Sequence, residues 1–272
     1  MSEGGNTGEG KTKEERRDFI ARHVEQQRYI SIEEITERFG VTTQTARRDI
    51  LALEEAGLVR RLHGGATIGM SVDPVIYRQR RVDNAQQKAR IGEQVAALIH
   101  DGAAVFIDTG TTCEAIAHAL VKRRDLRIVT YSLRVAMIFS EHSSFALAVP
   151  GGFVRPIDGG VFREDTADFI KRFKFDYAVI SVSGLDDDGD LCDDDHAEVA
   201  AVSTAIVQAE RTILAVDSSK FGKRAMVRLG PLADVDVLVT DALPEGGLLD
   251  IIHQSNIEVH IVATTLRRVA AS

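Results

Sequence analysis

The stretch T-T-Q-T-A-R-R-D-I, residues 42–50, decides how the first part of this chain folds. Ala46, Ile50 and Leu53 recur at steps of four and three, which predicts a helix with one buried stripe. The other faces of this helix carry Thr43, Gln44, Arg47 and Arg48. Glutamine can hydrogen-bond to adenine edges, and arginine to guanine or phosphate, so these faces suit a polyanion. We therefore interpret this stretch as the recognition helix of a helix-turn-helix.

The residues before this helix carry the start and stop signals of further helices. Ser31 and Glu34 form a capping box, which opens a helix with apolar residues at helical steps. Gly40 ends that helix, and Thr42 is placed to cap the next one. The segment 14–27 predicts a first helix. Three helices of this size, with a glycine in the turn between the last two, are typical of a helix-turn-helix.

The segment 58–67 predicts a β-ribbon wing, in which Arg60 and Arg61 are placed to contact the DNA backbone. The residues predicted to contact DNA are Thr42, Thr43, Gln44, Thr45, Arg47, Arg48, Arg60, Arg61, His63 and Gly64. The alternative is a small helical subdomain with ordinary surface arginines. The occurrence of cap, turn, arginine pair and wing together and in order favours DNA binding.

The charge balance excludes a general DNA-coating protein. The formal net charge is −8, from 33 Lys+Arg against 41 Asp+Glu. Residues 186–198 hold eight acids and no lysine or arginine, so the rest of the chain is formally neutral. A modest basic face favours a site-specific binder of double-stranded operator DNA that gains affinity as a homo-oligomer, either a dimer or a tetramer.

Length and composition bound the organisation of the chain. With 272 residues and 44% hydrophobic content there is room for a small domain and a larger one. Without a run of about eighteen apolar residues we expect no membrane span. Cys113 and Cys192 provide no disulfide framework, and the polar, glycine-rich N-terminus does not resemble a signal peptide, so we expect a cytoplasmic protein. The predicted parts are a disordered tail (1–13), a winged helix-turn-helix domain (14–68), a linker (69–87), an effector-sensing domain (88–262) and a C-terminal tail (263–272).

In the larger domain, short apolar strands alternate with helices. Examples are A-A-V-F-I, L-R-I-V-T, Y-A-V-I-S-V and T-I-L-A-V. This alternation predicts an α/β domain with a parallel sheet covered by helices on both faces. Ligands of such sheets bind beyond the carboxyl ends of the strands.

Two of these strand ends carry chemistry suited to a phosphate. The first is D-T-G-T-T, residues 108–112, where a glycine lets the backbone approach a ligand and a helix begins with free N–H groups. The second is D-S-S-K-F-G, residues 217–222, which delivers the cation of Lys220 to the same rim. The alternatives are a well-capped helix and a surface lysine. The residues predicted to bind a small phosphorylated metabolite are Asp108, Gly110, Thr111, Thr112, Gly151, Gly152 and Lys220.

We predict no metal site, no cofactor and no catalytic residue. The acidic run 186–195 does not match a calcium loop, because Gly184 occupies one of the positions that need an acid. We interpret the run as a solvated loop. Cys113 at a helix start is more typical of a small packing residue than of a redox sensor.

The chain resembles the DeoR family of bacterial transcriptional regulators. The landmarks are T-x-x-R-R-D followed by H-G-G-A, then F-I-D-T-G-T-T, V-P-G-G and D-S-S-K-F-G, and the resemblance spans residues 14–241. It is closest to the branch that represses glycerol-3-phosphate uptake and use. The resemblance implies a winged helix and a ribose-5-phosphate-isomerase-like sensor that binds a sugar or polyol phosphate and then loosens the operator complex. The resemblance assigns the phosphate loop of the family to residues 110–112 and the characteristic lysine of the family to Lys220.

The sequence departs from the family pattern near the expected pocket. Tyr131 stands where asparagine is common, Arg163 and Ser181 stand where glycine is usual, and Val202 and Ser203 replace a Lys-Arg pair. These departures add bulk and remove two cations. We therefore expect an effector that differs from glycerol 3-phosphate or binds weakly.

Three classes of function fit these observations. The leading one is a repressor of a carbohydrate or polyol catabolic operon that a small phosphorylated effector releases from DNA. The alternatives are a sugar-phosphate isomerase with an added DNA-binding domain and a ligand-independent repressor. The enzyme is disfavoured because no general acid–base pair is completed in the sequence.

Overall fold

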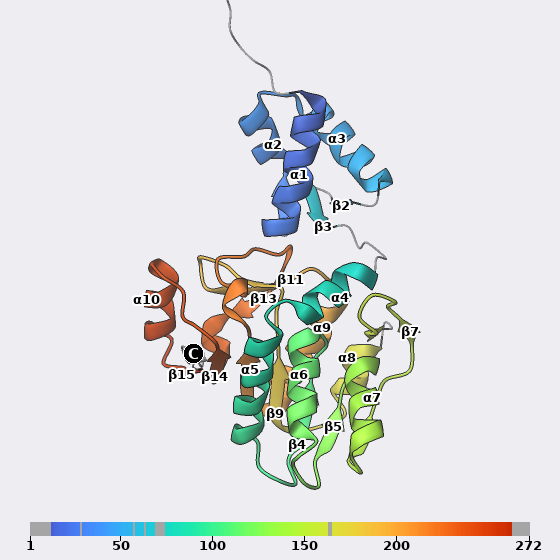
Figure 1. The fold of residues 1–272 in the computed structure, drawn as a ribbon, viewed down its shortest axis with the longest axis vertical. Helices are drawn as coiled ribbons and strands as arrows, with labels where there is room; N and C mark the ends of the chain where they lie inside the picture. Colours follow the sequence, from blue (N-terminus) through green and yellow to red (C-terminus); the bar gives the residue numbers. More distant parts are fainter. Residues whose placement is uncertain are drawn as a thin grey trace, which may run out of the picture. The chain divides into compact units, whose positions relative to one another are not determined.

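A computed structural model describes residues 12–27, 29–56, 58–62, 64–68, 74–162 and 165–262. Residues 1–71 and 72–272 form two compact units (Figure 1). The predicted tails, apart from residues 12 and 13, lie outside the described residues. Within the described ranges, no helix is long and apolar enough to cross a membrane.

The first unit is a winged helix. Its elements are α1 (Lys13–Gln27), β1 (Tyr29–Ser31), α2 (Ile32–Phe39), α3 (Thr43–Glu55), β2 (Val59–Leu62) and β3 (Gly65–Ile68). The three strands form an antiparallel sheet in the order β1-β3-β2. Its core is the predicted apolar stripe together with its partners, namely Ile20, Val24, Ile30, Ile32, Ile35, Ala46, Ile50, Leu53, Val59 and Ala66.

Local signals set the helix boundaries in this unit. The capping box of α2 is confirmed, with Ser31 Oγ accepting from the Glu34 N–H at 3.0 Å and Glu34 Oε2 accepting from the Ser31 N–H at 2.7 Å. Gly40 ends α2 in the left-handed conformation with φ of 62°. Thr42 Oγ1 accepts from the Thr45 N–H at 3.2 Å and caps α3.

Gly65 allows the third strand, β1, to join the wing. A Cβ at this position would lie 2.1 Å from the carbonyl oxygen of Ile30, on the neighbouring strand. A side chain there would force β1 and β3 apart, so this glycine meets a need for close backbone approach. The strand β1 itself was not predicted.

The second unit is built around a seven-stranded parallel sheet in the order β15-β14-β12-β9-β4-β5-β6. Its strands are β4 (Ala104–Ile107), β5 (Arg127–Val129), β6 (Ala146–Ala148), β9 (Phe175–Ile180), β12 (Ala209–Ala215), β14 (Val237–Thr240) and β15 (Glu258–Ile261). The helices are α4 (Pro74–Val82), α5 (Ala85–Leu98), α6 (Thr111–Leu120), α7 (Leu133–His142), α8 (Thr166–Ile170), α9 (His196–Gln208) and α10 (Gly247–Gln254).

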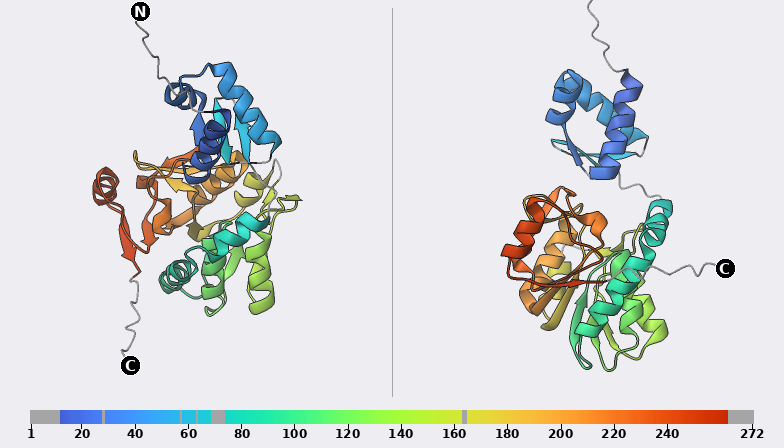
Figure 2. Two further views of the ribbon diagram at one scale, coloured as in Figure 1. Left: turned by 45° about the horizontal axis from the view of Figure 1, so that its top comes forward. Right: turned by 60° about the vertical axis from the view of Figure 1, so that its left-hand side comes forward.

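Helices cover both faces of this sheet, as Figure 2 shows. Helices α5, α6 and α7 pack on one face through a core that includes Ile91, Ile116 and Phe139. Helices α8, α9 and α10 pack on the other through a core that includes Ile170 and Ala201. Because both faces are covered, the strands carry buried apolar stretches, such as residues 105–107 of β4, 178–180 of β9 and 213–215 of β12. The predicted doubly covered parallel sheet is confirmed.

Several smaller elements were not predicted. They are the hairpin of β7 (Phe153–Val154) and β8 (Val161–Phe162), the antiparallel sheet of β10 (Gly184–Leu185), β11 (Asp190–Asp193) and β13 (Val227–Pro231), and the 3₁₀ turns η1 (Ser218–Lys220) and η2 (Leu232–Asp234). These strands are two to five residues long, which is too short for an alternating pattern to stand out.

The predicted linker, residues 69–87, is helical over most of residues 74–87. These residues form α4 and the start of α5. The linker was inferred from the scarcity of apolar residues, but Tyr77 of α4 is almost completely buried against the second unit. Residues 69–73 lie outside the described residues.

Candidate DNA interface and effector site

The predicted recognition helix α3 has one buried and one exposed face. Ala46 and Ile50 are buried in the core of the first unit, whereas Gln44, Arg47 and Arg48 are exposed. Of the other predicted contacts, Thr42, Thr43 and Gly64 are exposed and Thr45 is half-buried. The exposed face therefore carries the donors and acceptors that a base edge or a phosphate needs.

Asp49 fixes α3 to α1. This aspartate is only 2% exposed, and its Oδ2 accepts from Arg16 Nε at 2.6 Å while its Oδ1 accepts from Arg17 Nε at 2.9 Å. The arrangement places the carboxylate of the R-R-D motif on the inner side of the helix, with Arg47 and Arg48 left on the outer side. No local pattern in the sequence indicates this role of Asp49, because its partners lie more than thirty residues earlier.

The wing is only partly described. Arg61 of β2 is exposed and lies 3.6 Å from Glu54, measured from Nε to Oε2, and its N–H donates to Glu54 Oε1 at 2.9 Å. This contact ties the wing to the end of α3. Arg60 lies in β2, and its side chain falls outside the described residues, as does His63.

The loop after β4 has the features of an anion-binding turn. Gly110 adopts φ of 112°, and no described atom lies within 4 Å of the position that a Cβ would occupy. No described side chain caps the start of α6, so the N–H groups of its first turn lack a capping partner. Thr109 Oγ1 is buried and has no hydrogen-bond partner among the described residues. A buried polar atom without a partner is costly, and a bound ligand would satisfy it.

Asp108 begins this loop as a completely buried acid. Its carboxylate accepts a hydrogen bond from the Tyr131 hydroxyl, and also from the N–H of Thr109 at 2.7 Å and of Ser181 at 3.2 Å. Burial raises the pKa of Asp108 to about 7, although the hydrogen bond from Tyr131 acts to lower it. The predicted ligand loop thus contains an acid that titrates near neutral pH.

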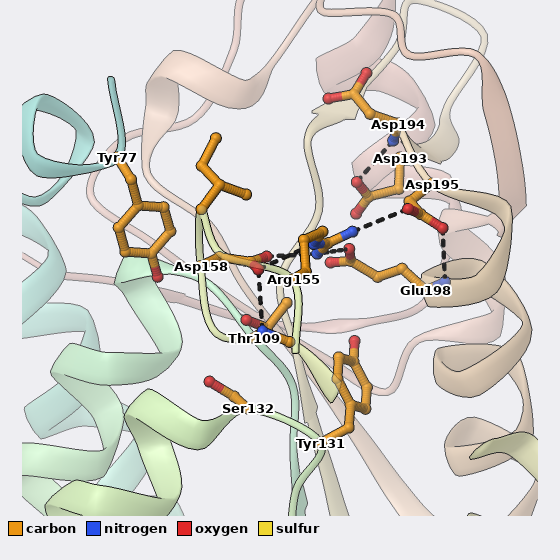
Figure 3. A network of polar contacts seen from close by, with 12 residues as sticks. Tyr77, Thr109, Tyr131, Ser132, Arg155, Asp158, Asp193, Asp194, Asp195 and Glu198 are labelled. Carbon is orange, nitrogen blue, oxygen red and sulfur yellow. Dashed lines mark hydrogen bonds and ion pairs between the residues drawn. The ribbon is translucent and has the colours of Figure 1, made fainter. Parts of the chain in front are cut away.

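Three more acids, Asp158, Asp195 and Glu198, form a network with Arg155 (Figure 3). Arg155 reaches Glu198 Oε2 at 2.5 Å and Asp195 Oδ2 at 3.0 Å, and it also contacts Asp158. Burial would lower the pKa of Arg155, but Glu198 and Asp158 outweigh burial and raise it. The network joins the hairpin β7–β8 to the first turn of α9, and it keeps a buried guanidinium charged.

Asp193 is a further buried acid of this cluster, and its charge acts on Glu198. Burial raises the pKa of both groups, and the charge of Asp193 raises that of Glu198 further while Arg155 opposes the rise. Asp193 Oδ1 also accepts from Ser183 Oγ at 2.8 Å. Asp108 is influenced by Asp193 as well, so the three carboxyl groups share one region.

Lys220 joins this region from the end of β12. It is half-buried in η1, and its charge acts to lower the pKa of Asp193 and of Asp217. Asp217 caps η1 by accepting from the Ser219 N–H at 3.2 Å. The structure therefore places Lys220 beside the acidic cluster that includes Asp108.

Gly151 and Gly152 lie in an exposed turn that leads into β7. Gly152 has φ of 154°, and no described atom lies within 4 Å of the Cβ position of Gly151. From this hairpin it is Arg155, three residues further on, that reaches the cluster.

Sequence reasoning missed Arg155, Asp193 and Glu198. The interpretation of the acidic run as a solvated loop is wrong for Asp193, which is 9% exposed and points into the cluster. The available signals were an acid on the first turn of α9 and an arginine followed by D-G-G. Neither signal predicts the cluster by itself, because the cluster forms only when two segments about forty residues apart in sequence pack together.

The raised pKa of Asp108 predicts a pH-dependent stability. An acid whose pKa is higher in the folded than in the unfolded protein stabilises the fold below its unfolded value, and this stabilisation is lost as the pH rises through about 7. We expect the melting temperature of the second unit to fall between pH 5 and pH 8, and Asp108→Asn to flatten this fall. Calorimetry at several pH values measures both effects, with Asp250→Asn on the exposed side of α10 as the control. An equal slope in wild type and Asp108→Asn would contradict the assignment.

A winged helix with an exposed basic helix, followed by an α/β unit with a ligand loop, is the architecture of a ligand-responsive DNA-binding regulator. The DeoR-like helix-turn-helix domain matches residues 16–72, and the DeoR C terminal sensor domain matches residues 83–242. The chain belongs to the DeoR family of transcriptional regulators and is a regulator, not an enzyme.

Individual relatives agree with this assignment. The glycerol-3-phosphate regulon repressor of Escherichia coli is 39% identical over 247 residues, which cover 91% of this chain and 98% of that protein. The glycerol-3-phosphate regulon repressor of Haemophilus influenzae is 42% identical and covers 85% and 90%. Among solved structures, ribose 5-phosphate isomerase A of Methanocaldococcus jannaschii is 14% identical with a TM-score of 0.38, and covers 51% of this chain and 55% of that one.

Proposed function

We propose that this protein represses a carbohydrate or polyol catabolic operon and leaves its operator when a small phosphorylated effector binds the second unit. The observation that carries the proposal is the uncapped start of α6 beside the unsatisfied hydroxyl of Thr109. Backbone N–H groups and a hydroxyl are the donors that a phosphate group requires. Lys220 supplies a positive charge to the same acidic region.

Glycerol 3-phosphate is the first effector to test, because two relatives are named for its regulon. Two departures from the family pattern are compatible with it. Tyr131 is completely buried against Phe106 and Phe162, so its bulk fills the core below the loop. Val202 of α9 packs into the apolar core. A cation at this position would therefore not lie beside a ligand, so its replacement by valine removes no ligand contact. Arg163 lies outside the described residues.

We infer that the protein acts as a homo-oligomer in the cytoplasm. A single small domain with one exposed helix makes few contacts with DNA, and dimers of helix-turn-helix domains gain affinity by binding two half-sites. Cys113 and Cys192 are both free and buried, which suits a reducing compartment. Effector binding would then act by disturbing the half-site spacing that the oligomer presents.

The proposal is tested by titrating an operator complex with phosphate esters. The operator is first selected from a random DNA library with the purified protein. We expect glycerol 3-phosphate, or a sugar phosphate in a parallel titration, to release the DNA, and glycerol alone to leave it bound. If no phosphate ester changes operator affinity, effector control of DNA binding is refuted and the protein acts as a ligand-independent repressor.

Lys220→Ala tests the cation of this site. A hydrogen bond to a charged group contributes about 1.5–3 kcal/mol, so we expect effector affinity to fall by roughly tenfold to a hundredfold. Calorimetric titration measures the dissociation constant, and operator binding without effector should be unchanged. Lys171→Ala removes a charge from an exposed position of the same unit and serves as the control. Equal effects of the two variants would contradict a specific role for Lys220.

A further inference from the structure

The corner between α4 and α5, residues 77–88, is the first part of the second unit that follows the DNA-binding unit along the chain. It packs against both motifs of the proposed effector site. One contact is made through α6, which begins in the loop at Gly110, and the other through η1, which carries Lys220.

Glu114 makes the first connection. It lies on the first turn of α6, one turn after the loop, and is 6% exposed. Its Oε1 accepts from the Tyr77 hydroxyl at 2.6 Å, and its Oε2 accepts from Arg81 Nε at 2.7 Å. The guanidinium carbon of Arg134 lies over the Tyr77 ring, 4.7 Å from its centroid. One carboxylate thus holds two successive turns of α4.

Asp217 makes the second connection. Its Oδ1 accepts from Asn84 Nδ2 at 2.9 Å, at the junction between α4 and α5. Asn84 adopts the left-handed conformation with φ of 55°, which is unusual for a residue other than glycine. Lys88 stiffens this junction, because its Nζ donates to the carbonyl oxygens of Arg80 at 2.5 Å and Asp83 at 2.7 Å.

Charged groups of both motifs act on Lys88, which lies in the α4–α5 corner. Burial lowers the pKa of Lys88, and the charges of Asp217 and Glu114 both act against this. A phosphate dianion at the start of α6 would stand about one helical turn from the Glu114 carboxylate. Two negative charges at that separation repel each other, and Arg81, which pairs with Glu114, would be attracted to both.

We propose that Glu114 and Asp217 couple the two halves of the effector site to the α4–α5 corner, so that α4 conveys effector occupancy to the DNA-binding unit. This inference rests on the effector site proposed above, and it identifies α4 as the element that responds to effector binding. An arriving phosphate weakens the hold of Glu114 on Tyr77 and Arg81 and shifts α4.

The alternative is that these contacts only anchor α4. An anchor would affect stability, whereas a coupling element affects the ratio of operator dissociation constants measured with and without effector. This coupling ratio separates the two roles because it does not depend on how tightly either ligand binds on its own.

The test uses Tyr77→Phe and Glu114→Gln in the full-length protein. Tyr77→Phe removes one hydroxyl and keeps the ring, and Glu114→Gln removes the charge and keeps the shape. Val82→Ala, at an exposed apolar position of α4, is the matched control. Operator affinity is measured by fluorescence anisotropy with and without saturating glycerol 3-phosphate, and glycerol 3-phosphate affinity is measured by calorimetry.

We expect both variants to lower the coupling ratio at least about fivefold while each ligand alone binds within about threefold of wild type. Val82→Ala should keep the wild-type ratio. The coupling role is wrong if both variants keep the wild-type coupling ratio. It is also wrong if Val82→Ala lowers the coupling ratio as much as they do. Neither of these outcomes contradicts the effector site. A wild-type protein that binds glycerol 3-phosphate without releasing DNA would also refute the coupling. A protein that binds no phosphate ester would refute the effector site, and this inference with it.

Discussion

Replacing Arg47 with alanine is expected to weaken binding to the selected operator by roughly tenfold to a hundredfold, because a bidentate arginine–base contact contributes about 1–3 kcal/mol of discrimination. Arg47 is exposed on α3, one position from buried Ala46, so its side chain is directed away from the core of the first unit. Truncating it removes the donor fork without disturbing the packing. Anisotropy titration of operator DNA measures the loss.

The same experiment distinguishes base recognition from phosphate contact. If Arg47 reads a base, Arg47→Ala lowers affinity for the operator far more than affinity for random DNA, and the salt dependence changes little. If it contacts a phosphate, both affinities fall together. Arg22→Ala removes one charge from an exposed position on α1 and is the control for net charge. An equal loss in Arg22→Ala and Arg47→Ala would contradict the assignment of α3 as the recognition helix.

Asp49→Ala is expected to destabilise the DNA-binding unit by about 3–5 kcal/mol, since it removes one partner of a buried ion pair and leaves a buried charge uncompensated. The uncompensated group is Arg16, which is 8% exposed. Because small domains have little stability to spare, such a loss is enough to unfold much of this unit at 37 °C. Operator binding should therefore be lost while effector binding to the second unit persists.

Hydrogen exchange locates this effect within the chain. We expect faster exchange throughout residues 13–68 of Asp49→Ala and unchanged exchange in the strands of the second unit. Asp18→Ala, an exposed aspartate on α1, is the control. A variant that keeps wild-type exchange and still fails to bind DNA would show that Asp49 acts at the interface and not in the fold.

Much of the fold was predictable because it depends on local rules. The capping box of Ser31 and Glu34, the left-handed stop at Gly40 and the cap at Thr42 each follow from hydrogen bonds between residues close in sequence. The apolar strands of the parallel sheet were predictable for a related reason, since burial on both faces leaves an uninterrupted apolar run. The short antiparallel strands of the second unit and β1 were not, because two to five residues carry no readable period.

The candidate site was predictable only in part. The loop at residues 108–112 and Lys220 are visible in the sequence because each follows an apolar strand, and parallel strands end at a common rim. Arg155, Asp193 and Glu198 come from a hairpin and a loop whose meeting depends on the packing of β7–β8 against α9. Tyr77 was assigned to a linker because no local pattern shows that a lone aromatic residue will be buried by a distant helix.

The amino-acid sequence alone determined that a winged helix precedes a parallel α/β unit, and which strand ends carry the residues proposed to bind a phosphate, because caps, turns and apolar periods act over a few residues. The tertiary structure alone decided that Asp49 would be buried between two arginines, that burial would raise the pKa of Asp108 to about 7, and that α4 would dock on both motifs of the proposed effector site. These properties arise from desolvation and from charges brought together across long stretches of chain, and no short segment of sequence contains both partners.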